Sequence, residues 1–148
     1  MEKLNELYNW LASERVLVSE QRLPFDSHNT RAVTVHINDA DMWGIFLDKD
    51  KMNSTADEAE ALYHEAGHYA TGATHAVHSP FDLVEKHEYK ANKWAVQNAI
   101  SEDELDEAVA SGCADLWSLS EHFNYPPDFI KMAVCWYVYG NLNIDLYF

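Results

Sequence analysis

Apolar residues near the start of the chain recur at spacings of three and four. This period is typical of an amphipathic helix, because such positions fall on one helix face. The residues that follow it are Leu4, Leu7, Tyr8 and Leu11. The pattern predicts a first helix that runs to about Ser13.

Two later segments, residues 31–38 and 42–48, have apolar residues at every second position, which is the period of a β-strand. The residues that share a face are Val33, Val35 and Ile37 in the first segment and Trp43, Ile45 and Leu47 in the second. The polar residues "NDAD" between them indicate a turn. We therefore expect an antiparallel hairpin in a small antiparallel sheet, to which "RVLVSEQ" could add a strand.

Helical patterns dominate the rest of the chain. The next helix is expected to start where Ser54 and Asp57, or Thr55 and Glu58, have the spacing of a capping box. It is expected to end at Gly72, a residue type that commonly terminates helices. Further helical patterns cover residues 82–100, 102–110, 113–124 and 126–139. We expect one domain, residues 1–148, of the α+β class, mostly helical, with a small sheet before the helix at 55–71.

Composition narrows the class of protein. The chain has 148 residues, of which 47% are hydrophobic, as expected for a folded globular domain. It shows neither a signal-peptide pattern nor an apolar run long enough for a membrane span, so we expect a cytoplasmic protein without membrane contact. The two cysteines, Cys113 and Cys135, are too few for a disulfide scaffold.

The net charge of −15, from 10 basic and 25 acidic residues, also limits the partners. A surface this acidic repels phosphate backbones, so we expect no direct binding of nucleic acid. It would suit a basic partner such as a DNA-binding protein. The alternative is that the charge serves solubility alone.

Residues 63–69, "YHEAGHY", contain an HExxH motif. In a helix, His64 and His68 lie one turn apart on the same face, where two imidazoles can bind one zinc ion. Glu65 can then take a proton from a metal-bound water. A polar helix stripe that contains two histidines by chance is the alternative, but the flanking apolar residues argue against it. Gly67 costs about 0.8–1.0 kcal/mol in a helix, and a closely packed backbone or an ion site would explain it.

A catalytic zinc site needs a third protein ligand. Glu88 shares a helix face with small and apolar residues that would pack closely against Gly67, and metal ligation would relieve the cost of burying its carboxylate. Glu85, about 60° further round the helix, is the rival ligand. An ordinary solvated glutamate at position 88 is the third possibility. The other histidines near the motif are interpreted as surface residues: His75, His78 and His87.

These residues resemble the ImmA/IrrE family of zinc metallopeptidases. The family's pattern is an HExxH helix followed by a helix that reads Glu-x-x-Ala-Asn-x-Phe-Ala. Its positions are occupied here by Glu88, Ala91, Asn92, Trp94 and Ala95. The lead-in to the motif and the downstream "LWSLSEHFNYPPDFI" are also similar, whereas "IS" replaces the Met-Pro that usually ends the second helix.

The resemblance implies a zincin-like fold, zinc bound by His64, His68 and Glu88, and Glu65 as general base. It also implies cleavage of an intracellular regulatory protein, typically a helix-turn-helix repressor of a mobile element or a stress regulon. Two other functions stay open: a metal-binding regulatory or interaction module that cleaves nothing, and a helical interaction domain with "LWSLSEHFNYPPDFI" as a helix-turn-helix. Unranked candidates for stabilising an oxyanion are Tyr63, Tyr69, Tyr89 and His122.

Overall fold

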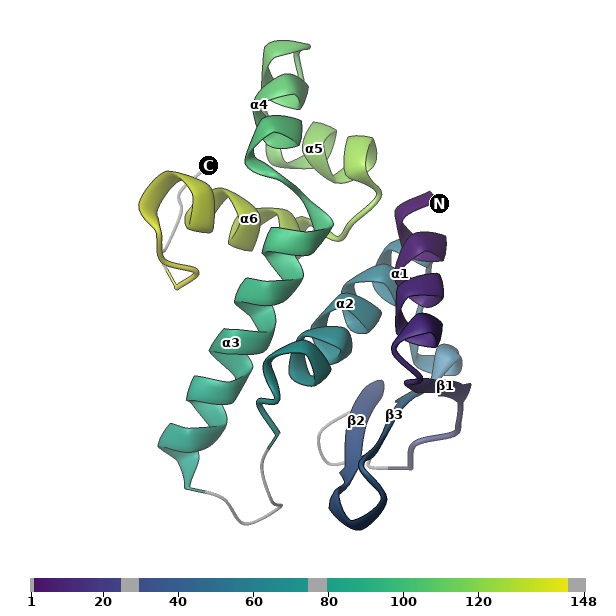
Figure 1. Ribbon diagram of the computed structural model, residues 1–148. Coiled ribbons are helices and arrows are strands. Elements are labelled where there is room, and N and C mark those ends of the chain that lie inside the picture. Colours follow the sequence, from purple (N-terminus) through teal and green to yellow (C-terminus); the bar gives the residue numbers. More distant parts are fainter. Residues whose placement is uncertain (1, 25–29, 75–79, 144–148) are drawn as a thin grey trace.

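The computed structural model describes residues 2–24, 30–74 and 80–143 (Figure 1). In chain order its elements are α1 Glu2–Ser13, β1 Leu17–Glu20, β2 Ala32–Ile37, the short 3-10 helix η2 Asn38–Ala40, β3 Met42–Leu47, the short 3-10 helix η3 Lys49–Lys51, α2 Thr55–Thr71, α3 Phe81–Ala99, α4 Glu102–Ala110, α5 Leu116–Phe123 and α6 Pro127–Tyr139. The predicted α+β fold, mostly helical with a small sheet before α2, is confirmed.

The sheet has the strand order β1-β3-β2. Strands β2 and β3 form the predicted antiparallel hairpin, and η2 with a left-handed Asp41 makes the turn. Strand β1 pairs with β3 in parallel, so the sheet is mixed and the prediction that it is antiparallel throughout is wrong. The reason is the connection: a tight turn forces the hairpin strands to run antiparallel, whereas the longer chain after β1 crosses to the far edge of the sheet first.

The two apolar faces predicted for the hairpin lie on opposite sides of the sheet. The cross-strand neighbours on the helix side are Ala32 with Leu47, Thr34 with Ile45 and His36 with Trp43. Ile45 and Leu47 are buried there, while Val35 and Ile37 point to the other side and are exposed. Both alternations were predicted correctly, but their relative placement depends on the pairing register, which neither segment determines alone.

Helices α1 and α2 lie on one side of the sheet, and α2 packs along α3 (Figure 1). The core between them and α6 contains large side chains that are almost fully buried: Leu11, Ile45, Leu62, Val96, Tyr125, Phe129 and Ile130. None of the helices in the described part of the chain is both long and apolar enough to cross a membrane.

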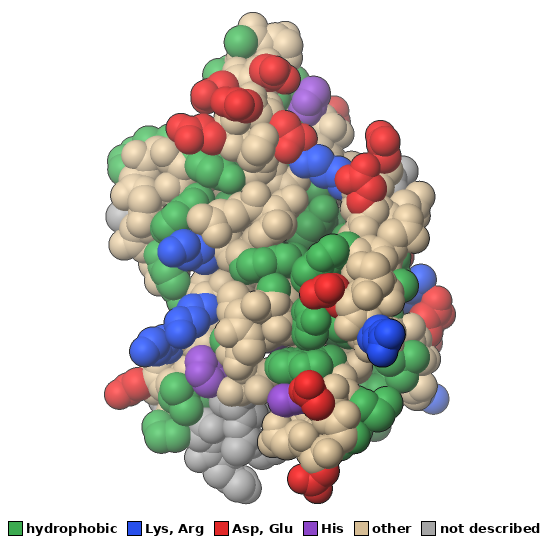
Figure 2. All heavy atoms as spheres, in the orientation of Figure 1, with side chains coloured by type: hydrophobic (Ala, Val, Ile, Leu, Met, Phe, Trp, Pro, Cys, Tyr) green, Lys and Arg blue, Asp and Glu red, His purple; other side chains and the backbone are tan. Residues whose placement is uncertain are grey.

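Helices α4 and α5 form an arm at the end of the molecule opposite the sheet (Figure 1). Acidic side chains gather over this arm in Figure 2. The sequence explains the gathering, because residues 94–130 contain no Lys or Arg. Much of the negative charge is thus carried away from the sheet.

Helix α2 begins and ends at residues suited to those places. The hydroxyl of Ser54 accepts a hydrogen bond from the amide of Asp57 at 3.2 Å, so of the two possible caps the one at Ser54 is used. Gly72 adopts a left-handed conformation (φ 65°) at the other end, as predicted. Helix α6 starts at Pro127, because proline is well suited to the first turn of a helix.

Candidate metal centre

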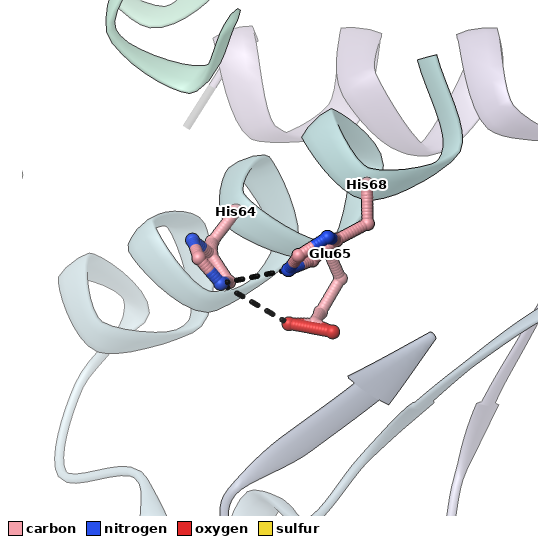
Figure 3. Close-up of side chains that lie close together, drawn as sticks. All are labelled: His64, Glu65 and His68. Carbon is pink, nitrogen blue, oxygen red and sulfur yellow. Dashed lines mark hydrogen bonds and ion pairs between the residues drawn. The ribbon is translucent and has the colours of Figure 1, made fainter. Parts of the chain in front are cut away.

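One face of α2 presents His64, Glu65 and His68 together (Figure 3). The two Nε2 atoms are 3.2 Å apart, and Glu65 Oε2 lies 3.9 Å from Nε2 of His64. Glu65 and His68 are only 7% and 6% exposed. Ligand atoms of the three side chains all lie within 4.8 Å of one another, so this group can hold a metal ion.

Helix α3 brings Glu88 to the same place. Its Oε2 lies 2.9 Å from Nε2 of His64, and its Oε1 lies 3.0 Å from Nε2 of His68. Glu85, the rival on the same helix, is exposed. Of the two glutamates weighed as a third ligand, the structure therefore brings Glu88 to both histidines, as its place on the small-residue face of the helix predicted.

The two helices approach closely because Gly67 has no side chain. A Cβ at this position would overlap the carbonyl oxygen of Ala91 and lie 3.0 Å from its Cα and carbonyl carbon. Ala91 is fully buried and stands between Glu88 and Asn92 in α3. The prediction that a packed neighbouring backbone explains Gly67 is confirmed, and this contact places one turn of α3 over the histidines.

The Nδ1 atom of each imidazole ring has a hydrogen-bond partner on the side away from Glu88. His64 Nδ1 lies 2.7 Å from Oδ1 of Asn92, and His68 Nδ1 lies 2.7 Å from the carbonyl oxygen of Ala73. Each oxygen accepts a hydrogen bond, so each Nδ1 carries a proton, and Nε2 is the nitrogen that can bind a metal ion once its own proton is lost. The ring orientations therefore suit metal binding on the side where Glu88 lies.

Strand β2 supplies a partner for Glu65. The hydroxyl of Thr34 lies 3.0 Å from Oε1 of Glu65 and 3.1 Å from the backbone carbonyl oxygen of the same residue. This leaves Oε2 as the oxygen on the side of His64. The sequence pattern gives Thr34 little prominence, since its only signal is a polar side chain on the helix side of a strand.

The charges of the site interact strongly. Burial opposes the protonation of His64, but the hydrogen bond that His64 donates to Glu88 and the negative charges of Glu65 and Glu88 outweigh it and raise the pKa of His64 to about 8. Burial likewise opposes the ionisation of Glu88, but its hydrogen bonds with His64 and His68 outweigh it and hold its pKa well below the ordinary value. A metal ion that binds these side chains displaces the proton that His64 and Glu88 share.

A cleft of about 700 Å³ opens beside the cluster. Its walls come from β2, α2, α3 and α6, and its lining includes Ala32, Thr34, Ala61, Asn92, Phe129 and Met132 besides the clustered residues. An ion pair between Arg31 and Glu60 borders it. The cleft is large enough for several residues of an extended peptide.

The remaining sequence candidates lie elsewhere. Tyr63, Tyr69, Tyr89 and His122 are not among the residues that line the cleft. His87 is half-buried on α3. His75 and His78 fall outside the described residues.

Comparison of the chain with protein-family models and with curated proteins finds no match. Any assignment of function therefore rests on the residues of the site and on the motif that contains them.

Proposed function

We propose that the protein is a zinc-dependent endopeptidase that cleaves an intracellular regulatory protein, most simply a DNA-binding repressor. The observation that carries the proposal is the position of Glu88, whose two oxygens lie 2.9 and 3.0 Å from the Nε2 atoms of His64 and His68. The resemblance of "YHEAGHY" and "HEYKANKWA" to the ImmA/IrrE family supports the same activity.

The donor set supports zinc as the metal. Two imidazole nitrogens and one carboxylate form one of the common ligand sets of catalytic zinc sites. Tetrahedral ligands at about 2.0–2.1 Å from zinc lie roughly 3.3 Å from each other. The two Nε2 atoms of His64 and His68 are 3.2 Å apart, which is near that value, and each lies 2.9 or 3.0 Å from a different oxygen of Glu88. When bound, zinc acts as a Lewis acid and lowers the pKa of a water molecule to about 7.

Other residues of the site would support the proton transfer. Thr34 holds Oε1 of Glu65, so Oε2 is available to accept a proton from water and to return it to the leaving amine. Asn92 and the carbonyl of Ala73 keep the two imidazole rings in place during this transfer. The burial of Glu65 keeps the proton within the site.

Strand β2 offers a place for the peptide. The amide of Asp48 donates to the carbonyl of Arg31 at 2.8 Å, which makes residues 31 and 48 a hydrogen-bonded pair of the hairpin. Antiparallel pairs alternate, so the N–H and C=O groups of Ala32 and Thr34 point to the free edge of β2, beside the cleft. An extended peptide can add there as a further strand.

The test compares wild type with Glu65→Gln in cells that co-express the transcriptional regulator encoded beside this gene. Wild type is expected to cleave the regulator, and Glu65→Gln is expected to bind zinc but not to cleave. A wild type that binds the regulator tightly without cleaving it would instead support the interaction module.

Metal content of the purified proteins tests the site separately. We expect about one zinc per chain in wild type, since three ligands form a single site, and loss of most of it in His64→Ala and Glu88→Gln. Glu85→Gln, on the exposed side of the same helix, is the matched control and should keep its zinc. A wild type that binds no divalent metal would refute the proposal.

A further inference from the structure

The side of the sheet that faces away from the helices is made almost entirely of apolar residues. The side chains that point to it are Leu17 and Ser19 of β1, Met42, Gly44 and Phe46 of β3, and Val33, Val35 and Ile37 of β2. We call this surface the outer face. None of its positions carries a charge, although the chain as a whole has a net charge of −15.

This face is exposed in the described part of the protein. Leu17, Ile37 and Met42 are 58%, 54% and 57% exposed, and Val35 is 39% exposed. None of the apolar residues of the outer face belongs to the hydrophobic core or packs against it. Monomeric soluble proteins rarely expose large contiguous apolar surfaces, and where they do the surface is often an interaction site.

The metal site explains why the apolar side of β2 points outward. Thr34 must face α2 to hold the carboxylate of Glu65, and alternation along the strand then directs Val33 and Val35 away from the helices. Shifting the register by one residue would bury the valines and lose the contact with Glu65. The register that brings Thr34 to Glu65 therefore leaves an apolar surface exposed on the other side of the sheet.

The shape of the outer face suits another sheet. Gly44 lies at its centre, between Leu17 and Val35, and has no side chain to project from the surface. The ring of Phe46 lies over this glycine, 3.3 Å from where a Cβ would be. The surface is therefore free of a central protrusion, as in sheets that pack face to face about 10 Å apart.

We propose that the outer face binds a second copy of this chain, with the two sheets packed face to face about a twofold axis. Two copies of a chain with a net charge of −15 repel each other where their acidic surfaces meet. The outer face brings no charged side chain into contact, and an apolar surface is complementary to itself, as a twofold interface requires.

The size of the outer face limits the strength of the dimer. One face of a three-stranded sheet is a small surface, and specific interfaces begin at a total of about 1,000 Å². We therefore expect a dimer that dissociates in the micromolar range. The cleft stays open in it, because it lies between the edge of β2 and the helices, and Val33 is the one residue of the outer face that also lines it.

Sedimentation velocity of the purified chain, from about 1 to 200 μM to span that range, tests the proposal without any need for a substrate. Wild type is expected to pass from monomer to dimer as the concentration rises. Ile37→Lys should stay monomeric throughout, because a lysine in the interface would be buried without a partner. This variant lowers the net negative charge, so its dissociation would not come from added repulsion.

Val138→Lys is the matched control, since Val138 is an exposed valine on α6, 62% exposed and distant in sequence from the sheet. It should form dimers as wild type does. Circular dichroism confirms that both variants fold. A wild type that remains monomeric at the highest concentration overturns the proposal, and so does a dimer that persists in Ile37→Lys or that is lost equally in both variants.

Discussion

Gly67 of α2 lies directly against the backbone of Ala91 of α3, so closely that not even a methyl group fits between them. Glu88 is three residues before Ala91 and Asn92 directly follows it. One backbone contact thus sets the distance at which α3 presents both a carboxylate and an amide to the histidines of α2.

The replacement Gly67→Ala should damage both stability and metal binding. Alanine favours helices by about 0.8–1.0 kcal/mol over glycine, but the clash with backbone atoms of Ala91 forces the helices apart at a typical cost of about 1–3 kcal/mol. We expect a net loss of stability in urea unfolding. We also expect zinc affinity at least tenfold weaker, because disturbing the contacts that hold metal ligands typically lowers metal affinity 10–100-fold. Ala70→Leu, at an exposed position of α2, should change neither. Unchanged zinc affinity in Gly67→Ala would contradict this account of the site.

The amide of Asn92 should affect metal affinity through the ring of His64. Removing a group that orients a metal-bound histidine costs typically 10–100-fold in affinity, so we expect a loss of that size in Asn92→Ala, measured by competition with a zinc chelator. Asn98→Ala provides the control, because Asn98 is on the same helix but is exposed and donates to the carbonyl of Trp94. Equal affinities in the two variants would show that the contact with Asn92 is structural only.

Thr34 should affect the acid–base step rather than metal binding. Thr34→Val keeps the shape of the side chain but removes the hydroxyl that donates to Glu65, and Thr34→Ser keeps the hydroxyl. We expect Thr34→Val to lower kcat/KM on the order of tenfold, with the zinc content unchanged, because Glu65 loses a charge-assisted hydrogen bond of about 1.5–3 kcal/mol. Thr34→Ser should retain most of the activity. A Thr34→Val variant that keeps the wild-type kcat/KM, or that loses zinc together with activity, would argue against this role.

Alkaline pH should unfold the protein through its buried tyrosines. Burial, with a smaller contribution from Tyr63, raises the pKa of Tyr125 far above the ordinary value of 10.0. A raised pKa in the folded state means that the stabilisation is fully present below about pH 10 and is lost as the pH rises above it, because only the unfolded chain then releases the proton.

Tyr125→Phe isolates this effect. At pH 7 it should cost about 1 kcal/mol, since the hydroxyl of Tyr125 donates to the carbonyl of Ala99, which retains the ammonium group of Lys3 as a partner. Between pH 9 and 11 the variant should lose less stability than wild type, as measured by urea midpoints. Tyr139→Phe, at a side chain 58% exposed, should follow wild type. Parallel pH dependences for Tyr125→Phe and wild type would contradict the prediction.

Local patterns predicted the parts of the site that depend on one helix at a time. The spacing of His64 and His68 places both on one face of α2, and the small apolar neighbours of Glu88 predict that its carboxylate turns toward another helix. Gly67 supplied the position of the contact, because a glycine inside a helix needs an explanation outside that helix. These inferences use only the period of the α-helix and the unfavourable helix propensity of glycine, both of which can be applied to the sequence directly.

The contacts that support the ligands were not predicted, because each depends on segments that meet only in the folded chain. The role of Thr34 follows from the register of β2 against β3 and from the placement of β2 beside α2. The parallel pairing of β1 has the same origin, since it brings together segments separated by the whole hairpin. Asn92 occupies a position of the pattern that resembles the ImmA/IrrE family. Its contact with His64 could not be predicted, because it depends on the distance between α2 and α3.

The end of α2 supports the candidate metal site. Gly72 turns the chain so that the amide of Ala73 donates to the carbonyl of His68 at 3.1 Å, while the carbonyl of Ala73 accepts from the ring of the same histidine at 2.7 Å. Residues 68 and 73 thus hold each other at both ends of a closed loop of the backbone. One residue added or removed before Gly72 would break both of these contacts. The residue that ends the helix therefore also fixes the orientation of the imidazole ring of His68.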